Sequence, residues 1–204
     1  MSVAKRTQKR SPVGLYGPLH ACWIAVCIVW TRLFLRPCRL VRLPIAVRGK
    51  RNINFGEGFV CGFMVRLDAF GGPGCISFGR NVELNDFVHI GSIGSITLGD
   101  EVMIASRVFI TDHDHGIYAG DGDHSDPATT PRARQEVCRP VTIGDRVWIG
   151  ENVSILPGTQ IGDGAIIGAN SVVKGIIPAG TIAAGIPARV IKRYDAALAK
   201  WVKA

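Results

Sequence analysis

An aliphatic residue recurs at every sixth position in the second half of the chain, and glycine often follows it. From Ile143 onward the aliphatic positions are 143, 149, 155, 161, 167 and 173. The same spacing occurs upstream in three shorter blocks, at 55, 61 and 67, at 78, 84 and 90, and at 98, 104 and 110. A six-residue repeat that covers roughly residues 53–178 predicts a solenoid of short strands.

Each hexad accommodates one short strand and one bend, so we expect three hexads to close one triangular coil. The aliphatic residues then point inward, and Gly or Asp-Gly turns the corners. A helix is excluded, because a position that recurs every six residues would wander around a cylinder of 3.6 residues per turn. Spacing alone does not give the handedness, for which the general crossover rule favours right-handed connections.

Charge divides the chain into two regions. Eleven Lys or Arg and no Asp or Glu lie within residues 1–51, whereas the remainder holds 13 basic and 16 acidic residues. The net charge of +8 therefore resides in the first quarter of the chain. We expect residues 1–52 to form a basic, apolar, helical extension, residues 53–190 to form the β-helix with a loop insertion at 111–140, and residues 191–204 to form a short C-terminal helix.

The apolar stretch of the extension, Ala21 to Trp30, is uncharged but too short to span a bilayer, and arginines follow it immediately. Large apolar residues between the basic ones favour a membrane surface over nucleic acid as the partner. Two interpretations stay open: the helix docks on an anionic membrane, or it packs across the open end of the β-helix. No cleavage site of a secretory signal follows, so we expect a cytoplasmic protein, with peripheral association at the inner face of the membrane as one possibility.

Six cysteines are present, with no C-x-x-C pair and no metal-ligand spacing. Several occupy or adjoin aliphatic repeat positions, Cys61 most clearly. We expect them to be small core residues in a reducing compartment.

The six-residue rhythm stops between Ile110 and Ile143, where the inserted segment is rich in Asp, Gly, Pro and His. This composition predicts an exposed loop, and long loops on a rigid scaffold tend to carry function. His113 lies at the root of the loop, where the preceding strand fixes its backbone. An imidazole there can take a proton from an attacking hydroxyl, so His113 is the candidate general base. Asp112, Asp114 or a backbone carbonyl would hold its tautomer.

The D-H-D-H segment has two other interpretations. It is a polar surface turn, or it contributes to a zinc site, for which His89, His113 and His115 are the available set. Zinc is the less favoured, because we expect His113 and His115 to point to opposite sides of their strand and because their spacing differs from that of zinc carbonic anhydrases built on β-helices. We therefore expect no metal.

Several segments together resemble one family. The hexads, the insertion beginning T-D-H-D-H-G, the segment V-W-I-G-E-N-V and the C-terminal A-A-G-I-P-A-R-V-I-K-R are similar to those of hexapeptide-repeat O-acetyltransferases of bacterial lipopolysaccharide and capsule biosynthesis, which belong with the maltose and galactoside acetyltransferases. The likeness covers nearly the whole chain. It implies a left-handed parallel β-helix, a homotrimer, and transfer of acetyl from acetyl-CoA to a sugar hydroxyl of a surface-polysaccharide precursor, free or lipid-linked.

The same resemblance implies roles for individual residues. It makes His113 the catalytic base and places Asn85 on a facing coil to position the acceptor or the base. In galactoside enzymes the backbone N–H of a Ser holds the oxyanion; Glu151 replaces that Ser here, and its backbone N–H can keep the role. The residues it implies for acetyl-CoA are Trp148, Ala169, Ser171, Lys174, Gly175, Arg189 and Lys192. Binding the phosphates of acetyl-CoA requires cationic side chains. Lys192 and Arg193 can alternatively be ordinary solvated charges on the C-terminal tail.

Two other functions stay open on the sequence. One is an N-acyltransferase that acts on a nucleotide-linked amino sugar, which would share the β-helix and the histidine base. The other is a β-helix used only as a structural platform, which would bind no acyl donor.

Overall fold

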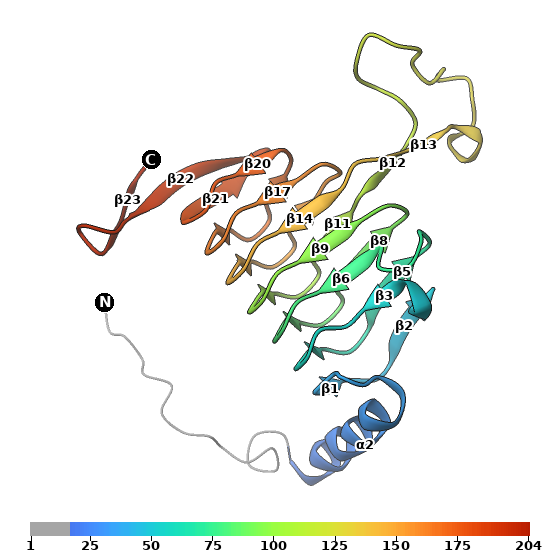
Figure 1. Cartoon of the computed structure of the whole chain (residues 1–204), viewed down its shortest axis with the longest axis vertical. Coiled ribbons are helices and arrows are strands. Elements are labelled where there is room, and N and C mark those ends of the chain that lie inside the picture. The colour runs from blue at the N-terminus through green and yellow to red at the C-terminus, as the bar shows by residue number, and fades with distance from the viewer. Residues whose placement is uncertain (1–16) are drawn as a thin grey trace.

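The chain folds into a triangular parallel β-helix that one α-helix covers at its first coil (Figure 1). The computed structural model describes residues 17–204. The part of the predicted basic extension within residues 1–16 lies outside the described residues.

Three parallel sheets form the faces of the triangle, here called A, B and C in chain order within each coil. Face A carries β1 (Leu40–Val41), β4 (Val60–Cys61), β7 (Glu83–Leu84), β10 (Met103–Ile104), β15 (Trp148–Ile149), β18 (Ile166–Ile167) and β21 (Thr181–Gly185). Face B carries β2 (Ile45–Arg48), β5 (Val65–Ala69), β8 (His89–Ser92), β11 (Phe109–Thr111), β16 (Ser154–Ile155) and β19 (Val172–Val173). Face C carries β3 (Ile53–Asn54), β6 (Ile76–Phe78), β9 (Ile96–Leu98), β14 (Val141–Ile143), β17 (Gln160–Ile161) and β20 (Ile176–Ile177), and a single 3-10 turn (Lys50–Asn52) precedes β3.

The aliphatic positions predicted from the hexads point into the triangle and form its core. All are buried except Phe55, which is half-buried and packs on the core. Successive coils stack in register, so that Leu67, Ile90, Ile110, Ile155 and Val173 form one column behind face B. Each coil therefore adds at least one inward side chain per face to a continuous apolar core, which is the main source of stability in a solenoid.

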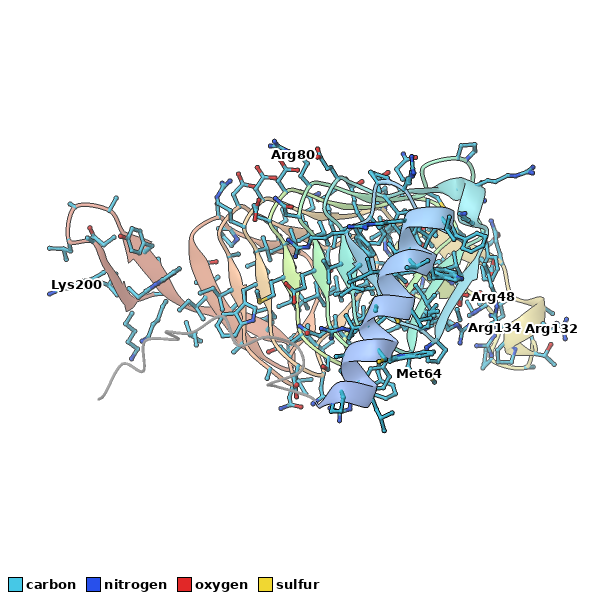
Figure 2. All side chains as sticks on the ribbon, turned by 90° about the horizontal axis from the view of Figure 1, so that it is seen from below. Arg48, Met64, Arg80, Arg132, Arg134 and Lys200 are labelled. Atoms are coloured by element: carbon cyan, nitrogen blue, oxygen red, sulfur yellow. The ribbon has the colours of Figure 1, made fainter. Side chains whose placement is uncertain are left out.

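The corner between faces C and A explains the Gly-Asp pairs of the repeat. The Asp100 carboxylate accepts a hydrogen bond from the Arg80 backbone N–H (2.7 Å), and Asp145 accepts one from the Asp100 N–H (2.9 Å). A Cβ on Gly99 would lie 2.3 Å from the Asp145 carboxylate, so the coils approach too closely for any side chain there. Figure 2 labels Arg80 at this corner, Met64 at the corner between faces A and B, and Arg48 at the end of a face B strand.

The loop insertion leaves the coil directly after β11 and returns at β14. Its two ends pair as antiparallel strands, β12 (His113–His115) and β13 (Glu136–Cys138), and a 3-10 turn spans Pro131–Ala133. Between them the chain projects away from the body of the solenoid (Figure 1). Because β14 pairs with β9 in register, the insertion interrupts the coil without shifting the stack.

Helix α2 (Pro18–Phe34) lies across the first coil, as Figure 2 shows from that end. Thr31 is fully buried, and its hydroxyl accepts a hydrogen bond from the Val41 backbone N–H (2.9 Å) while donating to the Cys27 carbonyl (2.6 Å). The helix thus packs on the end of the β-helix, one of the two interpretations left open. In the described part of the chain, no helix has the length and apolar character needed to cross a bilayer.

The β-helix begins earlier than residue 53, where the sequence placed its start. Strands β1 and β2 already pair with β4 and β5. Their inward aliphatic residues belong to a coil that prolines at 37 and 44 interrupt, so this coil shows no hexad spacing. The boundary predicted between extension and solenoid was wrong by about one coil.

The C-terminal helix predicted for residues 191–204 was also wrong, because this segment forms a β-hairpin. Strand β22 (Ala188–Asp195) pairs antiparallel with β21 and with β23 (Lys200–Lys203). Tyr194 and Trp201 face each other across the hairpin with ring centroids 5.4 Å apart. The open edge of β21 supplies backbone partners that an isolated short helix would not have, and this decides the structure of the tail.

The cysteines divide between core and surface. Cys27, Cys38, Cys61 and Cys75 are buried, and burial raises the pKa of the Cys61 thiol to about 12. Cys22 and Cys138 are exposed, so the expectation of core positions was wrong for these two.

Candidate active site

His113 lies where face B ends and the inserted loop begins, and its side chain is 18% exposed. Its Nδ1 lies 3.0 Å from Asp112 Oδ1 and 3.2 Å from the Thr111 hydroxyl. A carboxylate only accepts hydrogen bonds, so in the neutral form of the imidazole Nδ1 carries the proton and Nε2 keeps the lone pair. Of the partners left open by the sequence, the structure places Asp112 against the imidazole, whereas Asp114 pairs with Arg139.

Asp112 is fully buried and held by four donors. Besides His113, its carboxylate accepts hydrogen bonds from the Ser92 hydroxyl (2.6 Å) and from the backbone N–H groups of Gly94 (2.9 Å) and Ile93 (3.1 Å). Burial alone would raise the pKa of Asp112, but the hydrogen bonds from Ser92, His113, Ile93 and Gly94 outweigh it and lower that pKa below 3.8. Asp112 is therefore an anion at neutral pH and fixes the orientation of His113.

A cavity of about 430 Å³ opens beside His113 over the outer side of face B. Its lining residues are Arg66, Asp68, Phe70, His89, Gly91, Ile93, Phe109, Thr111, His113, His115 and Glu136. The walls thus combine aromatic rings with polar and charged groups, as is usual for a pocket that binds a small ligand.

His115 lies on the same cavity as His113, with ring centroids 6.0 Å apart. The expectation that these two side chains point to opposite sides was wrong, because residues two apart on a strand share a face. The His115 ring pairs with Glu136 at 3.5 Å. In the described part of the chain, no three His, Cys, Asp or Glu side chains converge as metal ligands.

A second histidine–carboxylate pair stands across the cavity and was missed as a functional cluster. His89 Nε2 lies 3.2 Å from Asp68 Oδ2, and Arg66 also donates to this oxygen at 2.6 Å. Burial would raise the pKa of Asp68, but hydrogen bonds from Arg66 and His89 and the charges of Arg66 and Arg48 lower it. The pKa of His89 is lowered, chiefly by burial, despite the hydrogen bond to Asp68. His89 is therefore neutral at pH 7, and its Nε2–H donates to the Asp68 anion.

The hexad register contained the signal for this cluster. Leu67, Ile90 and Ile110 are inward positions of one column, so the outward residues beside them in successive coils must be neighbours. Reading across the coils would have placed Asp68 and His89 next to the root of the loop.

Asn85 does not lie with His113 in a single chain. It follows β7 at the corner between faces A and B, where its side-chain amide donates to the Ile104 carbonyl (3.0 Å). His113 stands at the other edge of face B, and Asn85 is not among the residues that line its cavity. Glu151, Trp148 and Ala169 lie on the same side as Asn85, on face A or at its corner with face B.

The other residues implied for acetyl-CoA are spread over two places. Lys174 and Gly175 follow β19 on the His113 side, and Lys174 lines a second cavity of about 310 Å³ with Tyr118 and Arg139 of the inserted loop. Arg189 and Lys192 lie exposed on β22. Within one chain these residues do not converge on a single site, so their roles in binding acetyl-CoA stay predictions.

Ser171 cannot line a cofactor groove with its side chain. The residue is fully buried, and its hydroxyl donates to the Gly168 carbonyl (2.6 Å) and accepts from the Gly185 N–H (3.1 Å). This corrects the role that the resemblance implied, since Ser171 instead closes a corner of the coil.

Comparison with known proteins places these features in a family. The protein family described as "bacterial transferase hexapeptide (six repeats)" matches residues 140–175 of this chain. The putative lipopolysaccharide biosynthesis O-acetyl transferase WbbJ of Escherichia coli (strain K12) is 50% identical over 177 residues, which cover 87% of this chain and 90% of that protein. A maltose O-acetyltransferase structure from Clostridium difficile 630 is 30% identical, with a TM-score of 0.61 over 87% of this chain and 89% of that one.

A further solved structure shares the fold alone. AntD, an N-acyltransferase from Bacillus cereus solved with dTDP and coenzyme A, aligns with a TM-score of 0.65 over 80% of this chain and 84% of that one, at 21% identity. The fold expected from the sequence, a left-handed parallel β-helix, is thereby confirmed.

The Asp112 network predicts how stability depends on pH. Because the folded-state pKa of Asp112 is lowered, its contribution is complete above the ordinary carboxyl pKa of 3.8 and is lost as the pH falls through the lowered value. We expect Asp112→Asn to lower the free energy of unfolding at pH 7 by roughly 1–3 kcal/mol and to flatten the acid limb of the stability profile. Urea unfolding between pH 7 and pH 2 measures both effects, with Asp123→Asn in the exposed loop as the matched control. An unchanged acid limb would contradict the assignment.

Proposed function

This chain belongs to the hexapeptide-repeat acyltransferase family, and we propose that it transfers acetyl from acetyl-CoA to a sugar hydroxyl of a surface-polysaccharide precursor. The observation that carries the proposal is the pair of His113 and buried Asp112 at the edge of a sugar-sized cavity. The 50% identity to a lipopolysaccharide O-acetyl transferase over most of both chains supports the same activity.

This geometry supports one path for the proton in the proposed reaction. His113 Nε2 takes the proton of the acceptor hydroxyl as the hydroxyl oxygen bonds to the thioester carbonyl carbon. Asp112 stabilises the positive charge that His113 then carries, and it keeps Nδ1 protonated throughout. When the carbon–sulfur bond breaks, His113 returns the proton to the departing sulfur. The products are the O-acetyl sugar and free CoA, and His113 is restored.

The acyl donor supplies an activated acetyl group as a thioester, and exposed residues of this chain suit its other parts. Trp148 presents an indole that is 51% exposed on face A, which fits an apolar wall. Lys174, Arg189 and Lys192 are exposed cations suited to its phosphates. The backbone N–H of Glu151 remains our candidate for the oxyanion.

Replacing the base tests the activity. We expect His113→Ala to lower kcat by at least about a hundredfold, because the hydroxyl then attacks without a general base. The thermal unfolding temperature should change little, since a partly exposed side chain is removed. CoA release with a sugar acceptor measures the rate, and His124→Ala on the outer loop is the matched control. Comparable rates for His113→Ala and the wild type would refute the mechanism.

We also propose that the active enzyme is a homotrimer whose sites lie between subunits. The residues implied for one site stand at both edges of face B, so a single chain leaves them apart. In a cyclic trimer, the His113 edge of face B in one subunit can meet the Asn85 edge of face B in the next. Exposed apolar side chains gather on the Asn85 side, namely Phe63, Met64, Phe87, Met103 and Trp148. Such a strip is typical of a protein interface.

A charge placed in this strip should separate the subunits. Phe87 has a positive φ of 60° and meets Phe63 edge to face with ring centroids 5.3 Å apart, and Asp tolerates this backbone conformation. We expect Phe87→Asp to sediment as a monomer and to lose activity while keeping its β-sheet circular dichroism. Sedimentation velocity makes the measurement, with Leu198→Asp as the control at an exposed apolar residue outside the strip. A Phe87→Asp variant that remains trimeric would exclude this surface.

Helix α2 further supports placement at the inner face of the cytoplasmic membrane. Its outer side exposes Leu19, Trp23, Val26, Val29, Leu33 and Phe34, and Leu33 is 71% exposed. Arg32, Arg36 and Lys50 lie nearby, and both Arg36 and Lys50 bond helix carbonyls at its C-terminal end. Apolar side chains rimmed by cations fit the interface of an anionic bilayer. The inward side of the same helix covers the first coil, so packing on the β-helix and docking on a membrane are compatible functions of one helix.

Vesicle binding tests the membrane proposal. We expect the wild type to co-sediment with phosphatidylglycerol vesicles and much less with phosphatidylcholine vesicles. The double variant Val29→Asp and Leu33→Asp should lose most of this binding, whereas Leu198→Asp on the C-terminal hairpin should not. Equal binding by all three proteins would rule out α2 as the docking element.

The N-acyltransferase alternative receives less support. The O-acetyltransferases match at 50% and 30% identity, whereas AntD matches at 21% and supports the fold only. Parallel assays with a hydroxyl acceptor and its amino analogue separate the two activities.

A further inference from the structure

We propose that Arg66, Asp68 and His89 form a second subsite for the acceptor, which binds a hydroxyl next to the one that is acetylated. The acceptor is then a neutral sugar that presents two adjacent hydroxyls, one to His113 and one to Asp68. This inference rests on the proposed function and names the substrate class of the same cavity.

The strand register places the two histidine–carboxylate pairs on one surface. On face B, Arg66, His89 and Phe109 form one outward row across β5, β8 and β11. Asp68, Gly91 and Thr111 form the next row, and His113 follows directly from its end. The Asp68–His89 pair and the Asp112–His113 pair therefore stand on either side of Gly91.

Gly91 leaves an open space between the two imidazoles. A Cβ on this residue would lie 3.7 Å from His89 Nε2 and 3.8 Å from His113 Cε1, and nothing else lies within 4 Å. A group the size of a methyl would touch both rings at ordinary van der Waals distance. The backbone of Gly91 does not have positive φ, so the absence of a side chain serves the cavity rather than the conformation.

Asp68 has an oxygen that lacks a hydrogen-bond donor. Its side chain is 5% exposed, and Arg66 and His89 both donate to Oδ2. Oδ1 is buried and makes no hydrogen bond within the described residues; Arg48 approaches it at 3.5 Å as an ion pair without hydrogen-bond geometry. A buried acceptor without a donor is costly, and a carboxylate can only accept. The missing partner is thus a donor, which a sugar hydroxyl supplies.

The charges around the cavity favour a neutral ligand. Arg48 and Arg66 are balanced by Asp68 and by Glu136, and His89 is neutral. A carboxylate or phosphate on the acceptor would meet these two carboxylates as well as the arginines. Phe70 and Phe109 add exposed aromatic faces, which suit the apolar side of a sugar ring.

The test uses the full chain, acetyl-CoA and the methyl glycosides of galactose, glucose, mannose and rhamnose. For each accepted sugar, kcat/KM is compared with that of the analogue that lacks the hydroxyl next to the acetylated one. We expect the wild type to prefer the parent sugar by at least about tenfold, because the analogue leaves Asp68 Oδ1 without a donor. Asp68→Asn should lose most of this preference by acting poorly on the parent sugar, with rates on the analogue within about twofold of the wild type.

Three further variants distinguish loss of the subsite from a fold defect. Asp100→Asn removes another carboxylate paired with arginine outside the cavity and should keep the preference. Gly91→Ala disturbs no ion pair and should raise KM for the sugar by about tenfold without changing the affinity for acetyl-CoA, whereas Gly122→Ala in the open loop should leave both unchanged.

The results distinguish failure of the second subsite from failure of the proposed function. If the wild type acetylates a sugar but Asp68→Asn keeps the full preference, or Gly91→Ala leaves KM unchanged, the second subsite is wrong and the proposed function stands. If the wild type consumes acetyl-CoA neither with any of the four sugars nor with a surface-polysaccharide extract, the proposed function itself fails.

Discussion

In-register stacking of the coils determines both the core of this β-helix and the arrangement of the residues on its outer faces. One buried aliphatic side chain per strand, repeated in the column from Leu67 to Val173, fixes how each coil lies on the next. A slip of one residue would turn every inward side chain of a strand outward, so the register is strongly determined. The same register decides which outward residues become neighbours. It brings Asp68, Gly91 and Thr111, which are distant in sequence, into one row beside His113.

The chemistry depends on the place where the chain leaves this rigid stack. Asp112 is the first residue beyond β11, and the preceding coil supplies the Ser92 hydroxyl and two backbone N–H groups that hold it. His113 takes its orientation from Asp112 and therefore from the scaffold, while the loop beyond it projects away from the coils. Because β14 resumes its pairing with β9, a long functional loop is accommodated without loss of the core.

The sequence was a good guide wherever the six-residue period reports directly on burial. It predicted the core column, the loop and the residue at its root. It failed where the outcome depends on contacts between distant segments. The tail became a hairpin because β21 offered an open edge, and the Ser171 side chain closes a corner of the coil. The Asp68–His89 pair was missed because its members belong to successive coils, and only the register joins them.

Calorimetric titration of the full chain with acetyl-CoA, with free CoA as the control, shows whether this solenoid is an acyltransferase with one donor site per chain. We expect saturable binding near one equivalent per chain, because each pair of adjoining subunits in a closed trimer forms one site. A correctly folded protein that takes up no acetyl-CoA would contradict it.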